Sequence, residues 1–315
     1  MGHGHGHGHG GPGGHGAHGA GRAADRRRLR IVLAVTGSIM VLQAVGGLLT
    51  GSLALVADSA HMAMDAGGVL LALGASYVAA RPAGERSTFG YHRAEVVAAL
   101  ANAVVLLGLC AVLLWFGASR LVDPGEVDAG PMILFALSGL VANGVSMAVL
   151  SRSDTGSLNL RGALMEVVAD LLGSVFAIAA GVVILVTGWQ RADPVASLLI
   201  AVMILPRAVS LARDALRVLL EVAPDDLDLA AVTAHIRSMD GVLDVHDLHA
   251  WTITSGLPSL SAHVTVTEEA LAQHGVGGML DRISHCVAEH FEVRHATFQI
   301  EPATHRAHED LGEAH

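Results

Sequence analysis

Ionisable side chains interrupt a long apolar stretch, residues 53–71, that is long enough to cross a bilayer as a helix. Asp58, His61 and Asp65 follow one another at spacings of three and four residues, so all three project from one helical face. Because a charge placed in lipid costs at least about 2.5 kcal/mol, such residues usually face a polar interior and serve a function. An imidazole and a carboxylate on adjacent turns form half of a divalent-cation site. We therefore expect His61 and Asp65 to bind a metal ion, and Asp58 to support them or to face water.

A second pair with the same spacing lies in a later apolar stretch, where Glu166 and Asp170 are four residues apart. Two packed helices that each carry one pair bring four ligands into a tetrahedron, the geometry typical of zinc. Either pair alone could simply hydrogen-bond to a neighbouring helix, but two such pairs favour a metal site. Small residues near both pairs would allow the close helix approach that this site needs: Gly67, Gly68, Gly162, Gly173 and Ser174.

These pairs need a membrane-spanning framework, and the composition favours one, with 52% hydrophobic and 15% charged residues. Polar residues inside the apolar runs, Gln43, Asn102 and Asn143, are expected to hydrogen-bond between helices. Arginines gather before the first run and in alternate loops, so the positive-inside rule puts both termini in the cytoplasm. The lack of a basic patch argues against nucleic acid as a partner. Six runs approach the roughly 20 residues of a membrane span: 29–49, 53–79, 95–121, 132–150, 163–188 and 194–219.

The composition changes after Glu221, where amphipathic patterns replace the apolar runs. Their order predicts an α-β-β-α-β domain of the α+β class, resembling a ferredoxin-like fold. The expected elements are a helix at 229–238, strands at 242–253 and 260–267, a helix at 278–291 and a strand at 294–301. The fold class is therefore a polytopic membrane protein, with a six-helix transmembrane bundle followed by a cytoplasmic α+β domain.

The predicted strands carry a second group of metal ligands. His263 and Glu301 belong to the polar faces of their strands, and His246 and His249 precede them on the first strand. These side chains converge if the strands are neighbours, although histidines on the surface of a sheet are often only solvated. The remaining histidines of the domain are expected to be ordinary surface residues: His235, His274, His285, His290 and His295.

Both ends of the chain are predicted to be disordered tails, residues 1–25 and 304–315. The first is built almost wholly of glycine and histidine, a composition that cannot hold a fold. Weak metal capture is the favoured role for its imidazoles, and an inert tail is the alternative. The two cysteines, Cys110 and Cys286, form no CxxC motif and are expected to be reduced and structural.

Several of these motifs together resemble the cation diffusion facilitator family, and most closely its bacterial zinc-exporting branch. The resemblance covers about Arg26 to Pro302, with the motifs in the expected order. The motifs are Ala-Asp-Ser-Ala-His61 with Asp65, Glu166 and Asp170 followed by Leu-Leu-Gly-Ser, Phe89-Gly90-Tyr91-His92-Arg93-Ala94-Glu95, and Ala192-Asp193-Pro194.

The resemblance implies a homodimeric antiporter in the lipid of a bacterial inner membrane. It would export a divalent cation, with zinc favoured, in exchange for protons, and it would use no organic cofactor. The implied transport ligands are His61, Asp65, Glu166 and Asp170. The implied domains are a transmembrane domain over 26–221 and a cytoplasmic domain over 222–303, which would tighten the dimer on binding metal through His246, His263 and Glu301.

Two positions depart from the family pattern. Glu166 stands where zinc transporters of this family commonly have histidine, and a carboxylate makes the site harder and adds an oxygen that can take up a proton. Gln299 stands where some relatives have a histidine ligand, so the cytoplasmic cluster has one ligand fewer. The metal preference and the number of protons exchanged are therefore open.

Two other functions fit some of these residues. A membrane-embedded metal hydrolase could also use His, Asp and Glu, but the chain has no HExxH motif, and Glu166 is the only candidate base. A membrane-anchored metal sensor would need the C-terminal cluster but not the charges within the membrane. A transporter explains both sets of residues, so we expect no enzymatic activity.

Overall fold

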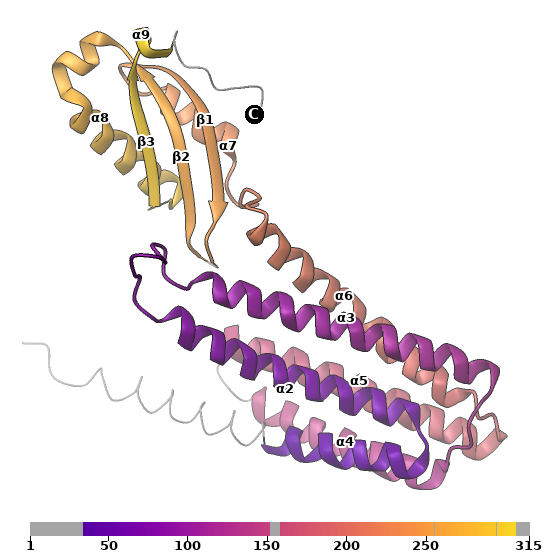
Figure 1. Ribbon diagram of the computed structural model, residues 1–315. Helices are drawn as coiled ribbons and strands as arrows, with labels where there is room; N and C mark the ends of the chain where they lie inside the picture. The colour runs from indigo at the N-terminus through magenta and orange to yellow at the C-terminus, as the bar shows by residue number, and fades with distance from the viewer. Residues whose placement is uncertain (1–33, 152–157, 255, 294, 307–315) are drawn as a thin grey trace, which may run out of the picture. The chain divides into compact units, whose positions relative to one another are not determined.

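The computed structural model describes residues 34–151, 158–254, 256–293 and 295–306 (Figure 1). The glycine- and histidine-rich tail, the beginning of the first predicted span and residues 307–315 lie outside this range. The chain divides into two compact units. One unit contains the residues up to Gly67 together with Val105–Arg207, and the other contains Gly68–Val104 together with the residues from Ala208 onward.

Five helices are long and apolar enough to cross a membrane, and a shorter apolar helix, Ala34–Thr50, precedes them. This shorter helix begins at the first described residue, so together the helices account for the six predicted spans. The chain is accordingly an integral membrane protein. The five helices are α2 (Leu53–Ala79), α3 (Arg93–Val122), α4 (Ala129–Leu150), α5 (Leu158–Thr187) and α6 (Ala192–Leu219).

Glycines allow neighbouring helices to approach closely. A Cβ atom at Gly139 of α4 would lie 2.5 Å from Nε2 of Gln43, and one at Gly173 of α5 would lie 2.1 Å from Oδ1 of Asp58. Gly68 of α2 likewise leaves room for the side chain of Asn102. By contrast, no described atom of another helix lies within 4 Å of a Cβ at Gly67, so its expected packing role is not seen.

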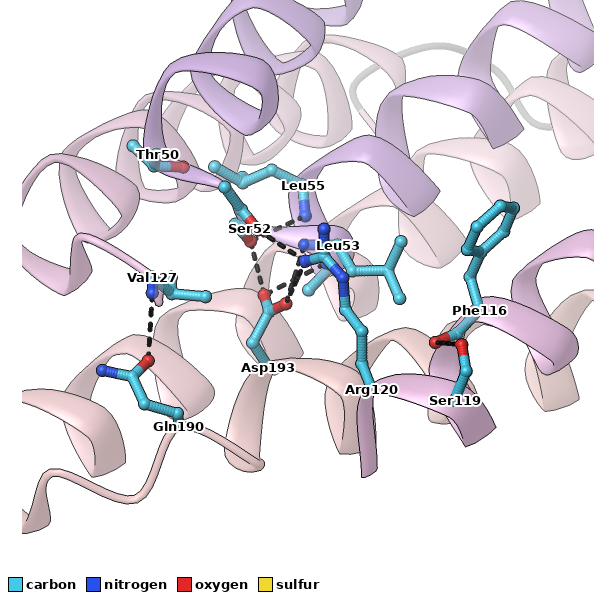
Figure 2. Close-up of polar contacts among 12 residues, drawn as sticks. Thr50, Ser52, Leu53, Leu55, Phe116, Ser119, Arg120, Val127, Gln190 and Asp193 are labelled. Carbon is cyan, nitrogen blue, oxygen red and sulfur yellow. Dashed lines mark hydrogen bonds and ion pairs between the residues drawn. The ribbon is translucent and has the colours of Figure 1, made fainter. Parts of the chain in front are cut away.

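The N-terminus of α2, the helix that carries His61 and Asp65, is capped by a carboxylate from α6 (Figure 2). Asp193 is fully buried and accepts hydrogen bonds from the backbone N–H groups of Leu53, at 2.7 Å, and Ala54, at 3.1 Å. It also accepts one from the hydroxyl of Ser52, at 2.5 Å. The guanidinium of Arg120 lies 4.0 Å from the same carboxylate. Asp193 therefore satisfies two N–H groups that a helix leaves unpaired at its start.

The C-terminal part of the chain forms a three-stranded sheet with helices, in the predicted order. Strand β1 pairs antiparallel with β2, and β2 pairs parallel with β3, so β2 is central. The elements are α7 (Leu229–Arg237), β1 (Val242–Thr252), β2 (Pro258–Val266), α8 (Glu268–Phe291), β3 (His295–Pro302) and a short α9 (Ala303–Arg306).

One face of this sheet packs against α7 and α8. Alternate residues of β2 are buried in the same hydrophobic core as residues of both helices. Because strand side chains alternate between faces, the intervening residues, including His263, lie on the opposite face. The core includes Val232 and Ile236 of α7, Leu260, Ala262, Val264 and Val266 of β2, Met279, Ile283 and Val287 of α8, and Phe298 of β3.

Helix α8 begins ten residues earlier than the sequence predicts. The hydroxyl of Thr267 accepts a hydrogen bond from the Ala270 N–H and so caps the helix start. The backbone of Gly275 is not helical, with φ of 67° and ψ of 170°, so α8 consists of two helical pieces that meet at a kink there. Glycine adopts a positive φ at little cost, and the piece after the kink contains the helix predicted at 278–291.

Candidate functional site

The first predicted ligand pair lies on α2. Nε2 of His61 is 3.5 Å from Oδ2 of Asp65, so the two side chains meet across one helical turn, as their spacing predicts. His61 is buried, and Asp58 is fully buried one turn earlier. The polar side chains beside it are those of Gln43 and Ser174.

The second pair lies on α5, and an arginine connects it to the first. Nη1 of Arg207, on α6, lies 3.4 Å from Oδ2 of Asp65, and its Nη2 lies 3.1 Å from Oε1 of Glu166. Asp170 is buried, and its Oδ1 accepts no hydrogen bond from the described chain. One guanidinium therefore lies between two of the four predicted ligands. The sequence indicates Arg207 only as one of the arginines near a membrane edge, so its contact with the ligands is a finding of the structure.

The four predicted transport ligands are close but do not enclose an ion in this conformation. No three of His61, Asp65, Glu166 and Asp170, all of them described, place ligand atoms within 4.8 Å of one another. Tetrahedral zinc needs ligand atoms about 3.5 Å apart. The structure thus joins His61 to Asp65 directly, and Asp65 to Glu166 only through Arg207.

Buried polar side chains surround Asp58. Nε2 of Gln43 donates to Oγ of Ser174 at 3.5 Å, which agrees with the expectation that Gln43 hydrogen-bonds between helices. Asn143 is also fully buried, but its amide has no hydrogen-bond partner in the part of the chain described here. Gly173 provides the space for the Asp58 carboxylate. The region beside the ligand pairs is therefore polar within an otherwise apolar helical unit.

The second predicted metal group converges on the polar face of the C-terminal sheet. His246, His263 and Glu301 each place a ligand atom within 4.8 Å of the other two. Oε1 of Glu301 is 2.9 Å from Nδ1 of His263, and its Oε2 is 3.7 Å from Nε2 of His246. Glu301 is buried. Two imidazoles and a carboxylate are a donor set that suits zinc, and a buried carboxylate facing two imidazole nitrogens fits a cation.

Asp247 and Gln299 also contact this cluster, and the sequence gives no indication that Asp247 belongs to it. Asp247 adopts a left-handed conformation, with φ of 47°, at an irregularity in β1, and its Oδ2 lies 3.7 Å from Nε2 of His263. Its Oδ1 lies 2.9 Å from Nε2 of His249. Gln299 does not replace the missing histidine ligand but donates from Nε2 to Oε1 of Glu301 at 2.8 Å. It therefore orients the carboxylate.

Comparison with known proteins gives two family models that together cover most of the chain. The model described as the cation efflux transmembrane domain matches residues 29–220. The model described as the cytoplasmic domain of cation efflux proteins matches residues 224–303.

Similar proteins of known name are metal transporters. The metal cation efflux system protein CzcD of Cupriavidus metallidurans is 41% identical over 290 residues, which are 90% of this chain and 91% of the relative. The zinc transporter ZitB of Escherichia coli is 38% identical, over 88% of each chain. The cadmium, cobalt and zinc/H(+)-K(+) antiporter of Bacillus subtilis is 34% identical, over 91% of this chain and 93% of the relative.

Proposed function

Because this chain belongs to the cation efflux family, also called the cation diffusion facilitator family, we propose that it exports zinc from the cytoplasm in exchange for protons. Transport of divalent cations, and not enzymatic activity, is what the family and its named members share. The choice of zinc and of proton exchange is supported by the names of the E. coli and B. subtilis relatives. We further assign residues 26–221 to the transmembrane domain and 222–303 to the cytoplasmic domain.

One observation supports the proposed transport site most strongly: Asp65 of α2 and Glu166 of α5 share a single positive charge, the guanidinium of Arg207. Carboxylates from two helices thus already attract a cation between them. In our proposal His61, Asp65, Glu166 and Asp170 bind the transported ion when α2 and α5 bring them together. The bound ion then replaces Arg207 as the positive charge that pairs with Asp65 and Glu166.

Exchange with protons follows from the chemistry of these ligands. A metal ion requires a neutral imidazole and ionised carboxylates, so protons and the cation compete for the same atoms. An inward-open state that favours the metal would bind the ion from the cytoplasm. An outward-open state that meets a more acidic medium would release the ion and return protons. No separate proton pathway is needed in this scheme. Both termini would lie in the cytoplasm of a bacterial inner membrane.

We also propose that the protein is a homodimer whose cytoplasmic domains associate more tightly when metal binds. The family model for residues 224–303 supports a role for this domain in dimerisation. The geometry of His246, His263 and Glu301 supports a regulatory zinc site there, because their ligand atoms already lie close together. This site is distinct from the transport ligands, since it lies on the C-terminal sheet.

Flux measurements in liposomes with an imposed pH gradient test the proposed transport. We expect zinc uptake that depends on the gradient and reverses when the gradient is reversed. The double variant Asp65→Ala with Asp170→Ala should lose this flux while still inserting into the membrane. Glu85→Gln is the matched control, because it removes an exposed carboxylate from the loop between α2 and α3. It should transport at the wild-type rate.

Other outcomes would exclude parts of this proposal. Zinc flux that ignores the pH gradient would exclude proton exchange, and full flux in the double variant would place the transport site elsewhere. If the protein binds zinc but moves no cation in either direction, it is a metal sensor and not a transporter. The same assay with cobalt, cadmium and manganese establishes which cation the site prefers.

A further inference from the structure

Three further metal-binding side chains converge in the C-terminal domain, away from His246, His263 and Glu301. They are His235 of α7 and Cys286 and His290 of α8, and a ligand atom of each lies within 4.8 Å of those of the other two. The two imidazole rings are 4.5 Å apart between centroids. Nothing in the sequence places residue 235 beside residue 290, which is why both histidines are expected there as ordinary surface residues.

We propose that His235, Cys286 and His290 form a separate site that binds a divalent transition metal through one thiolate and two imidazoles. This mixed sulfur and nitrogen donor set suits zinc and cobalt. Tetrahedral ligands lie about 3.5 Å apart, so small rotamer changes are enough to close the group around an ion. Three protein ligands leave the fourth position for water. This site does not depend on the transport function proposed above.

Neighbouring groups already orient the two imidazoles. Nδ1 of His290 lies 2.9 Å from the carbonyl oxygen of Cys286, so an N–H at Nδ1 donates there and leaves Nε2 free for a metal. Backbone carbonyls commonly fix metal-binding histidines in this way. The ring of Phe291 packs edge-on against that of His235, with centroids 5.5 Å apart. Cys286 and His290 are four residues apart, so both project from one face of α8.

The position of the group in the fold also favours a cation. His235 lies in the last turn of α7, and His290 lies in the last turn of α8. The C-terminal end of a helix carries a partial negative charge of about half an electron, which attracts cations. Burial, with a smaller contribution from Glu289, raises the pKa of the Cys286 thiol. The thiol therefore keeps its proton until a metal displaces it.

This group and the cluster around Glu301 lie on opposite sides of the sheet. His263 alternates along β2 with Ala262 and Val264, which face the core formed with α7 and α8. The proposed site instead joins the ends of those two helices on the core side. A bound metal would tie α7 to α8 within the helical layer, whereas the other cluster links the three strands.

Cobalt absorption of the full-length protein in detergent tests the proposal, because only a thiolate ligand produces the near-ultraviolet sulfur-to-cobalt charge-transfer band. The chain has two cysteines, so Cys110 in α3 is the only other possible source. We expect the band in the wild type and in Cys110→Ser, and its complete loss in Cys286→Ser. It should be lost or strongly weakened in His235→Ala and His290→Ala. Zinc, which has no such band, should displace the cobalt.

His285→Ala is the matched control, because His285 lies on the same helix but pairs with Glu289, at 3.4 Å, outside the group. It should keep the full band. A second measurement uses Cys110→Ser, in which zinc should slow maleimide labelling of Cys286 about tenfold or more, since only the metal-free thiol reacts. That protection should disappear when His235→Ala is added. A cobalt complex without the band, or zinc protection that survives His235→Ala, would overturn the proposal.

Discussion

Arg207 places a permanent positive charge between two residues that we propose as ligands of the transported cation. Its guanidinium contacts both Asp65 and Glu166, so the incoming ion must compete with it. Half of the Arg207 side chain is exposed, and exposed ion pairs contribute only about 0–1 kcal/mol each. We therefore predict that Arg207→Gln tightens zinc binding about fivefold, which corresponds to about 1 kcal/mol.

Competition with a fluorescent chelator, in detergent and at low salt, measures this affinity. Arg213→Gln is the matched control, because it removes an exposed arginine from the same helix without touching the ligands. Its zinc affinity should equal that of the wild type. Unchanged or weaker zinc binding in Arg207→Gln would mean that the guanidinium does not compete with the ion.

Glu166 should determine which metal the transport site prefers. A carboxylate favours harder cations such as manganese, whereas an imidazole suits zinc and its neighbours. We predict that Glu166→His raises the preference for zinc over manganese about tenfold, a difference of about 1.4 kcal/mol. Competitive uptake of both ions into liposomes measures the ratio. Glu166→Asp keeps the carboxylate and should leave the preference closer to that of the wild type; an equal shift in both variants would contradict the explanation.

Whether a contact in these sites can be predicted from the sequence depends on how far apart its two residues lie along the chain. A spacing of four residues on an apolar helix is enough to pair His61 with Asp65, because helix geometry dictates which side chains meet. Arg207 is 142 residues from Asp65 and 41 from Glu166, so only the packing of α6 can bring it there. The contact between His235 and His290 cannot be predicted for the same reason, since it depends on how α7 and α8 pack.

At the scale of helices, the cap that Asp193 provides should determine how firmly the start of α2 is held. Asparagine can accept with one oxygen only, and its amide would face the N–H groups that the carboxylate now binds. Losing a buried, charge-assisted cap costs about 2 kcal/mol. Asp193→Asn should therefore lower the melting temperature in detergent, and it should also reduce transport because α2 carries His61 and Asp65.

A second aspartate at a helix start provides the control for this prediction. Asp128 is the N-cap residue of α4, but its side chain makes no capping hydrogen bond. Asp128→Asn should change stability by no more than about 0.5 kcal/mol, as is usual for exposed positions. Thermal unfolding of both variants in the same detergent compares their losses of stability. Equal destabilisation would show that the capping bonds to α2 are not what Asp193 contributes.

The elements themselves could be predicted well wherever one physical signal dominates. Long apolar runs identify α2 to α6, and alternating residues identify the face of β2 that packs on the helices. The piece of α8 before Gly275 could not be predicted, because the glycines at 275, 277 and 278 are typical of a loop. The left-handed turn at Asp247 has no clear sequence signal either, since aspartate adopts that conformation only occasionally.

At the scale of the whole molecule, the proposed sites separate transport from regulation. The ligands on α2 and α5 belong to one compact unit, and His246, His263 and Glu301 belong to the other. Zinc can therefore act on the protein in two ways that substitutions should distinguish. Variants of the transport ligands should leave the response of the cytoplasmic domain intact, and variants of the sheet cluster should leave the transport ligands intact.

A measurement of dimerisation distinguishes the effect of zinc at the sheet cluster from its effect at the transport ligands. A homodimer has two sheet clusters, one in each protomer. If zinc binds them only in the dimer, zinc at 100 times its dissociation constant adds about 2.7 kcal/mol per cluster, or about 10,000-fold in dimer affinity for the two together. We predict up to this increase for the wild type and for Asp65→Ala with Asp170→Ala, and none for Glu301→Gln. The isosteric Gln preserves the shape of a buried side chain while removing its charge, so the domain should remain folded.

Mass photometry of dilute protein in detergent, with and without zinc, measures the dimer fraction. His249→Ala is the matched control, because His249 contacts Asp247 but lies outside the group of three ligands. Its dimer fraction should rise with zinc as in the wild type. If Glu301→Gln responds to zinc as fully as the wild type does, the sheet cluster does not govern association. Since the dimer is measured without any ion gradient, this conclusion holds whichever cation the transport site carries.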